Sequence, residues 1–202
     1  LKRLGGMHDG TAIPVERNSL DVKGSRPSGV TFTHQEIQAV TETDDAIINR
    51  VRAHTSQGTT LHIAANTELA EPLFLHRTQF GVDSAEFART QIRVGNHAQA
   101  TIVLENSGDT RIAEDVEIVV EPGAHLTLIS LQEWGAATIH AARHHAVVDR
   151  TAGAERLRGR VPDSARRVCV ESEVRRLRRH GRDPLRHLHA LDVPARELRR
   201  GG

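Results

Sequence analysis

Cysteine, tyrosine and long apolar runs are scarce or missing in this sequence. Cys169 is the single cysteine among 202 residues, which excludes an intramolecular disulfide and a metal site built from cysteines alone. No apolar run approaches the about 20 residues that span a bilayer, and residues 1–7 lack the hydrophobic core of a secretory signal peptide. We therefore expect a cytoplasmic protein. Because residue 1 is Leu, we also expect the natural chain to begin earlier.

Short β-branched segments dominate residues 98–150. Their apolar residues alternate, as in Val116, Ile118 and Val120, which places one row of side chains on one face of a strand. Turn signals such as Glu-Pro-Gly at 121–123 separate these segments at a spacing of roughly ten residues. Strands this short without intervening helices form an all-β sheet or the coils of a solenoid.

The few aromatic residues favour the solenoid. The sequence has no Tyr, four Phe and one Trp, and we expect Phe74 and Trp134 to be the aromatic anchors of the strands. A sandwich core usually contains more large aromatics. Rungs filled by Val, Ile and Leu therefore predict a β-helix.

The sequence divides into three parts. Residues 1–56 predict an irregular segment with short helices, because apolar residues between 33 and 52 fall at helical spacing and Thr33 is a possible N-cap. Residues 57–153 predict the β-helix coils. Within them we expect strands at 61–64 and 72–76 and a loop at 80–87.

Residues 154–202 predict an Arg-rich tail that is disordered or irregular. Residues 151–202 contain 14 Arg, no Lys and 7 acidic residues, whereas residues 1–150 contain 13 basic and 19 acidic residues. Arg without Lys is common when GC-rich DNA is translated in the wrong frame, and we expect a change of frame near residues 153–156. The alternative is a genuine basic tail that binds nucleic acid, which the absence of aromatic residues for base stacking disfavours.

The histidines are the first candidate metal ligands. On a strand, His144 and His145 point to opposite faces, while His140 and His144 share a face about 13 Å apart, too far for one metal ion. We therefore expect polar or edge-facing histidines. A cupin-like metal-dependent β-barrel enzyme is the alternative, and it would need further ligands from His62, His76, His97 and His125.

Other candidate residues carry weaker signals. Cys169 would be a thiolate acceptor only if the tail is genuine. Alternation on strands predicts a solvated face for the acidic pairs Glu114 and Asp115, and Glu117 and Glu121. Ser130 lacks the Gly-x-Ser-x-Gly context, and Gly5, Gly6 and Gly10 lack the Lys-Ser/Thr end of a phosphate loop. We assign no catalytic, cofactor-binding or metal-binding residue.

Four segments carry a family resemblance. They are residues 1–4, residues 7–10, Leu-Thr-Leu-Ile-Ser-Leu-Gln-Glu-Trp at 126–134 and His-Ala-Ala-Arg-His-His-Ala-Val-Val at 140–148. Together they resemble the SufD-like members of the SufB/SufD family of Fe–S cluster assembly proteins. The resemblance covers residues 1 to about 153.

This resemblance implies a right-handed parallel β-helix and a scaffold role without catalysis. It implies SufB-like and SufC-like partner subunits, with ATP bound by the SufC-like partner and an Fe–S cluster handled by the complex. The family residues proposed to hold a nascent cluster lie beyond the matching part. None is therefore carried onto this sequence, and we expect no cofactor on this chain.

Overall fold

The computed structural model describes residues 6–7, 11–12, 14–16, 19–77, 81–149, 153–158 and 167–176, with the backbone alone for Glu16 and the last two ranges. Strands and one short helix make up nearly all of this part. The elements are β1 (Pro14–Glu16), β2 (Leu20–Val22), β3 (Val30–Glu36), α1 (Ala46–His54), β4 (Gln57–Ile63), β5 (Leu73–Arg77), β6 (Gly81–Val94), β7 (Gln99–Gly108), β8 (Thr110–Val120), β9 (His125–Trp134), β10 (Ile139–Val148), β11 (Gly153–Arg158) and β12 (Arg167–Arg176).

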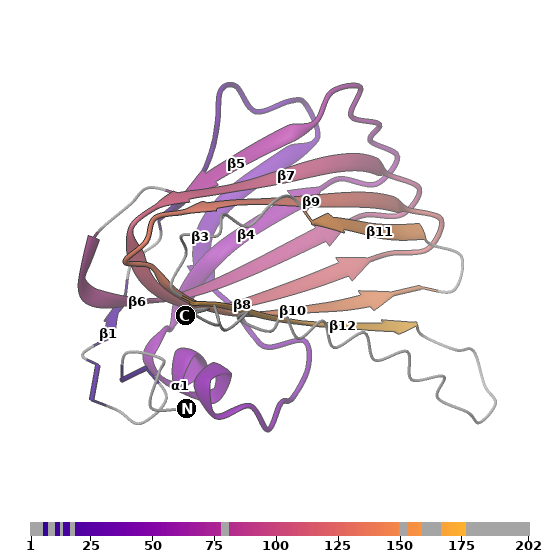
Figure 1. Cartoon of the computed structure of the whole chain (residues 1–202). Helices are drawn as coiled ribbons and strands as arrows, with labels where there is room; N and C mark the ends of the chain where they lie inside the picture. Colours follow the sequence, from indigo (N-terminus) through magenta and orange to yellow (C-terminus); the bar gives the residue numbers. More distant parts are fainter. Residues whose placement is uncertain are drawn as a thin grey trace, which may run out of the picture.

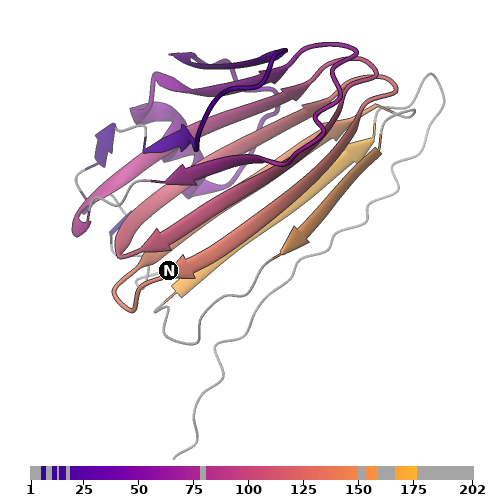
Figure 2. The ribbon, with the colours of Figure 1, turned by 90° about the horizontal axis from the view of Figure 1, so that it is seen from above.

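The strands form two layered sheets (Figures 1 and 2). Sheet A has the order β12-β10-β8-β6-β4-β3, with β1 paired to β6, and sheet B has the order β11-β9-β7-β5-β2. From β4 to β12 the chain alternates between the sheets, and each strand pairs in parallel with the equivalent strand of the next turn. This arrangement is a β-solenoid of about three turns, which confirms the predicted fold class.

The main core lies between the two sheets, because alternate side chains of each strand point inward. Equivalent residues of successive turns stack in register, as Val94, Val120 and Val148 do in sheet A and Ile102 and Leu128 do in sheet B. All five are buried. Each such side chain contributes about 1.5–3 kcal/mol by leaving water, so the stacked rows hold the two sheets together.

One corner of the solenoid repeats the same backbone conformation in three turns. Asn66, His97 and Gly123 all have positive φ, at 59°, 57° and 70°. The amide of His97 donates to the carbonyl of Pro122 in the next turn (3.1 Å), as the amide of Asn66 does to the carbonyl of Asn96 (2.8 Å). This stacking of left-handed residues keeps the turns in register.

The N-terminal part is more regular than expected. β1, β2 and the start of β3 occupy residues predicted to be irregular, and β2 and β3 pair in antiparallel fashion with β5 and β4. Within the segment predicted to contain short helices, residues 33–36 belong instead to β3, and α1 supplies a short helix from Ala46 onward. The N-cap is Asp45, not Thr33, since its Oδ1 accepts from the amides of Ile47 (2.8 Å) and Ile48 (2.9 Å).

Two further expectations are corrected. Residues 81–87 belong to β6 and are not a loop, while Phe80 lies outside the described residues. Part of the Arg-rich tail also continues the sheets, because β11 pairs with β9 and β12 pairs with β10. The remaining tail residues lie outside the described part, and the proposed change of frame stays a prediction.

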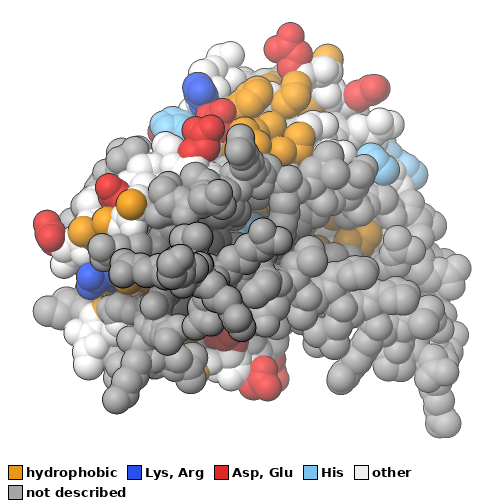
Figure 3. All heavy atoms as spheres, in the orientation of Figure 1, with side chains coloured by type: hydrophobic (Ala, Val, Ile, Leu, Met, Phe, Trp, Pro, Cys, Tyr) orange, Lys and Arg blue, Asp and Glu red, His pale blue; other side chains and the backbone are white. Residues whose placement is uncertain are grey.

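The outer face of sheet B carries apolar side chains. Phe74, Val103 and Ile129 lie in register across β5, β7 and β9, and Phe74 is 36% exposed. Hydrophobic side chains gather on the upper part of the face in Figure 3, where sheet B lies in Figure 1. Phe74 is therefore not the interior anchor that the sequence predicted, whereas Trp134 is buried.

Helix α1 covers the other side of the molecule. It packs on the face of sheet A that points away from sheet B (Figure 1), where its Val51 clusters with Phe87 of β6 and Ala113 of β8. In the part of the chain that the structure describes, no helix is long and apolar enough to cross a membrane.

Candidate functional site

Strand β8 carries buried acidic side chains on both of its faces. Glu114 points between the sheets, while Asp115 and Glu117 point toward α1, and all three are at most 4% exposed. The sequence predicted these carboxylates on a solvated face, and that prediction is wrong. A buried carboxylate is stable only with partners that compensate its charge, and both faces supply them.

On the inner face, Arg77 of β5 and His140 of β10 bind Glu114. Nη2 of Arg77 donates to Oε2 of Glu114, and Nε2 of His140 lies 2.9 Å from Oε1. An ionised carboxylate only accepts hydrogen bonds, so Nε2 of His140 must carry the proton in this contact. The three residues come from different strands and link sheet A to sheet B through the interior.

The guanidinium of Arg77 also reaches three other inward-pointing groups. Its Nε donates to Oδ1 of Asn106 (3.2 Å), and its Nη1 donates to Oγ of Ser19 (2.8 Å) and to Oε1 of Glu86 (3.4 Å). Ser19 donates in turn from its Oγ to the same oxygen of Glu86 (2.5 Å). Arg77 therefore connects Ser19, Glu86, Asn106 and Glu114 at one end of the solenoid interior, which we call the polar end.

The two inner carboxyls have pKa values shifted in opposite directions. Burial raises the pKa of Glu86 above its usual range, and the positive charge of Arg77 only partly opposes this effect. Burial would also raise the pKa of Glu114, but Arg77 and the hydrogen bond from His140 outweigh it and hold that pKa well below its usual range. Glu114 is thus the ionised partner of Arg77, and Glu86 is the carboxyl that favours protonation.

Several polar atoms of this inner cluster have no hydrogen-bond partner among the described residues. They are Oε2 of Glu86, Nδ1 of His140 and Nε1 of Trp134. The rings of His140 and Trp134 pack against each other with centroids 5.0 Å apart. Buried polar groups normally bind each other or ordered water. These three atoms are exceptions to that rule at the polar end of the solenoid interior.

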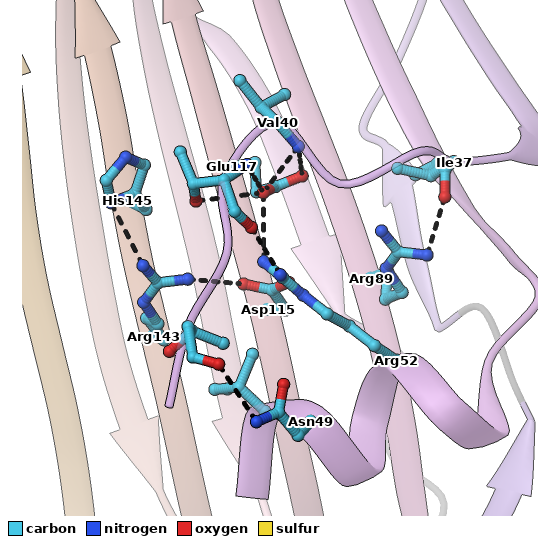
Figure 4. Close-up of polar contacts among 12 residues, drawn as sticks. Ile37, Val40, Asn49, Arg52, Arg89, Asp115, Glu117, Arg143 and His145 are labelled. Carbon is cyan, nitrogen blue, oxygen red and sulfur yellow. Dashed lines mark hydrogen bonds and ion pairs between the residues drawn. The ribbon is translucent and has the colours of Figure 1, made fainter. Parts of the chain in front are cut away.

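The outer cluster joins sheet A to the segment that precedes α1 (Figure 4). Arg52 of α1 donates from Nε to Asp115 (2.7 Å) and from Nη2 to Glu117 (3.1 Å). Glu117 also accepts from the amides of Val40 (2.9 Å) and Thr41 (3.2 Å). Two carboxylates of one strand thus position a helix and a loop that lie more than sixty residues earlier in the sequence.

Further cations border the outer cluster. Nη1 of Arg143 on β10 lies 3.9 Å from Asp115, and its Nη2 donates to Nδ1 of His145 (3.3 Å). Arg89 of β6 donates to the carbonyl of Ile37 (2.7 Å), and burial lowers its pKa while Asp115 and Glu117 oppose that shift. The positive and negative charges alternate across β6, β8 and β10, which limits the free-energy cost of burying them.

The structure scatters the candidate histidines. His140 and His144 point into the interior and His145 points outward, and all three are buried. His144 and His145 therefore lie on opposite faces, as predicted, whereas the predicted edge positions are wrong. Elsewhere His62, His97 and His125 are exposed and His76 is half-buried. Within the described residues no three His, Cys, Asp or Glu side chains form a metal-binding group, and the parallel solenoid excludes the cupin-like barrel.

The remaining candidates lie apart from both clusters. Ser130 is buried in the interior and accepts from the side chain of Gln132 (3.3 Å). Glu121 is half-buried beside the repeated corner. Cys169 lies on β12 opposite Ala141, with its side chain outside the described part, and Gly5 and Gly10 also lie outside it. Gly6 accepts from the amide of Ala12 (3.0 Å).

A comparison with protein families matches this solenoid. The model of the SufBD core domain of the SUF system of FeS cluster assembly matches residues 76–176, half of the chain. The chain belongs to the SufBD family. The match runs through β11 and β12 and so extends past residue 153, near which the resemblance was expected to end. No solved structure matches the chain significantly.

Two mycobacterial relatives support the SufBD assignment. An iron-sulfur cluster assembly SufBD family protein of Mycobacterium tuberculosis (strain ATCC 25618 / H37Rv) is 27% identical over 156 residues, which cover 75% of this chain and 39% of the relative. A SufBD family protein of Mycobacterium leprae (strain TN) is 26% identical over 162 residues, covering 75% and 40%. The chain thus spans about two fifths of the length of these curated relatives.

Sequence reasoning missed most residues of the two clusters in this SufBD chain. No local sequence pattern marked Arg52, Arg77, Glu86 or Arg89 as buried, because their partners lie far away in the sequence. The ladder register would have been a usable signal, since Ala88, Glu114 and Ala142 align across β6, β8 and β10. Small residues on both sides of an acidic residue leave room for a cation from the opposite sheet.

Proposed function

We propose that this chain is a scaffold subunit of a SufBCD-type complex in cytoplasmic iron–sulfur cluster assembly. In this role it binds a SufB-like subunit by stacking of solenoid coils, and a SufC-like subunit binds ATP. The chain itself performs no catalysis and holds no cofactor. Membership of the SufBD family is the observation that carries the proposal.

The architecture supports a stacking role. β11 and β12 lie at the edges of sheets B and A among the described strands, and the parallel pairing repeats without interruption up to them. The edge of a parallel sheet presents backbone donors and acceptors to a further strand. At the opposite end the antiparallel strands β2 and β3 interrupt the repeat. The β11 and β12 end is therefore the side on which further coils would stack.

The inner charges suit a rigid scaffold. Arg77 bonds to groups from three strands and to Ser19, and Glu114 is held from both sheets. Networks in which most members are hydrogen-bonded fix the relative positions of the elements that carry them. Hydrogen bonds and ion pairs thus fix the two sheets at the polar end of the interior, and packed apolar side chains fix them in the rest of it.

Co-expression tests this function directly. The tagged chain is produced together with the SufB-like and SufC-like subunits from the same source, and the eluate is analysed by size-exclusion chromatography with light scattering. We expect a stoichiometric complex that contains all three chains. Recovery of the tagged chain alone, while the two other subunits bind each other, would overturn the proposal.

A pair of proline variants tests the stacking end. Val168→Pro with Val170→Pro removes backbone donors from β12, and Thr31→Pro with Thr33→Pro does the same in β3 at the opposite edge of sheet A. Circular dichroism first checks that both variants keep their strand content. We expect the β12 variant to lose the SufB-like subunit and the β3 variant to retain it. The reverse pattern would contradict stacking through β11 and β12.

A further inference from the structure

Residues 38–44 cross the outer face of sheet A between β3 and α1, and we call them the strap. None of these seven residues is buried, and Val40 is 37% exposed although its side chain is apolar. The residues at the two ends are fixed in place. Ile37 is buried before the strap, and Asp45 caps α1 after it.

Polar contacts hold the strap on the sheet. Both oxygens of Glu117 accept from the amide of Val40 (2.9 and 3.0 Å), and one of them accepts from the amide of Thr41 (3.2 Å). Nη1 of Arg52 donates to the carbonyl of Thr41 (2.5 Å). The contacts at the centre of the strap thus converge on one carboxylate and one guanidinium, as Figure 4 shows. Towards its ends, the carbonyl of Thr43 accepts from Asn49 (3.1 Å) and that of Gln38 accepts from Gln91 (3.5 Å).

The neighbouring helix is held differently. Ile48 and Val51 of α1 are buried, and Val51 packs with Phe87 of β6. A net hydrogen bond contributes about 0.5–1.5 kcal/mol, whereas full burial of an aliphatic side chain contributes about 1.5–3 kcal/mol. The strap therefore lacks the interactions that would keep it closed as firmly as α1 and the strands.

We propose that the strap is a hinged cover that opens as a unit between Ile37 and Asp45 while α1 and the solenoid stay folded. Opening removes the strap amides from Glu117, so that this buried carboxylate of β8 becomes exposed beside the guanidinium of Arg52. Segments with few buried apolar contacts open with lower free energies than the global unfolding of the same protein. This device does not depend on the proposed function.

Amide hydrogen exchange of the full chain, read by NMR, tests the strap. In the wild type we expect the amides of Val40 and Thr41 to exchange much faster than that of Ile118, which lies within the β8 ladder. Glu117→Gln removes the charge from the shared acceptor, and we expect about tenfold faster exchange at Val40 and Thr41, equivalent to about 1.4 kcal/mol. Exchange at Ile118 should not change.

Two further variants make the test specific. Glu121→Gln, directly after the end of β8, is the control for loss of a carboxylate charge away from the strap, and it should leave the strap amides unchanged. Val40→Pro removes a donor from the strap without altering the buried carboxylates, and it should speed exchange at Thr41 in the same way. Equal exchange rates at Val40, Thr41 and Ile118 in the wild type would overturn the proposal. Uniform acceleration of all amides in Glu117→Gln and Val40→Pro would overturn it as well.

Discussion

Glu114 and Glu117 lie three positions apart on β8, and arginines from different elements hold their carboxylates on opposite faces of sheet A. Arg77 reaches Glu114 from β5 through the interior, and Arg52 reaches Glu117 from α1 outside. One strand thus connects the second sheet and the N-terminal helix to the same ladder. The predictions below separate the contributions of these contacts.

Loss of the charge on Glu114 should be strongly destabilising. Glu114→Gln leaves the buried guanidinium of Arg77 without its ionised partner, and breaking a buried pair in this way costs about 3–5 kcal/mol. Urea denaturation followed by circular dichroism measures the change. The control is Glu105→Gln, whose surface pair with Lys23 should contribute less than about 1 kcal/mol. Equal losses for the two variants would contradict the role of burial.

Glu86 should make folding stability fall as pH rises. Its pKa is raised in the folded state, so above the ordinary value of 4.5 the folded protein binds more protons at this carboxyl than the unfolded chain. The stability that Glu86 contributes is fully present below pH 4.5 and is lost as the pH rises through the pKa of Glu86 in the folded protein. Glu86→Gln removes this dependence and should flatten the plot of unfolding free energy against pH in that window. Parallel plots for the wild type and the variant would refute the prediction.

Glu114 does not interfere with that measurement. Its pKa is lowered by folding, so the stability it contributes is present above 4.5 and is lost only as pH falls through the folded pKa. The two carboxyls of one cluster therefore act in separate pH windows. A pH series on both sides of 4.5 distinguishes them.

The N-cap of α1 gives a smaller and local effect. Asp45→Ala removes the acceptor of two helix amides and should cost about 1 kcal/mol of unfolding free energy. The neighbouring Asp44 is exposed, and Asp44→Ala should change the stability by less than half of that amount. Chemical denaturation of both variants makes the comparison. Equal effects would assign the loss to net charge and not to capping.

The repeated corner can be tested at Gly123. A Cβ there would lie 2.2 Å from Nδ1 of His97 at a φ of +70°, whereas a Cβ at Gly24 meets no atom within 4 Å at a φ of +88°. Ala in a left-handed conformation costs about 1–2 kcal/mol. We expect Gly24→Ala to lower the unfolding free energy by this amount and Gly123→Ala to lower it further. Thermal or urea unfolding that ranks them in the opposite order would show that the corner adapts.

The local pattern of the sequence predicted much of the fold. Alternation at Val116, Ile118 and Val120, and turn signals at roughly ten-residue spacing, indicated strands that stack as a solenoid. The same rule failed for residues 81–87, because Asp83, Ser84 and Glu86 resemble a loop when their partners are unknown. It also misplaced the start of the helix, since Asp45 and Thr33 are both acceptable N-caps and only packing distinguishes them.

The sequence by itself determined where strands form and which of their faces can be apolar, because both follow from side chains two positions apart. It did not determine which polar residues would be buried. Arg77 and Glu114 are 37 residues apart and Arg52 and Asp115 are 63 apart, so their pairing depends on how the turns stack. Only the tertiary structure brings each cation within hydrogen-bonding distance of its carboxylate, and that proximity is what makes their burial stable.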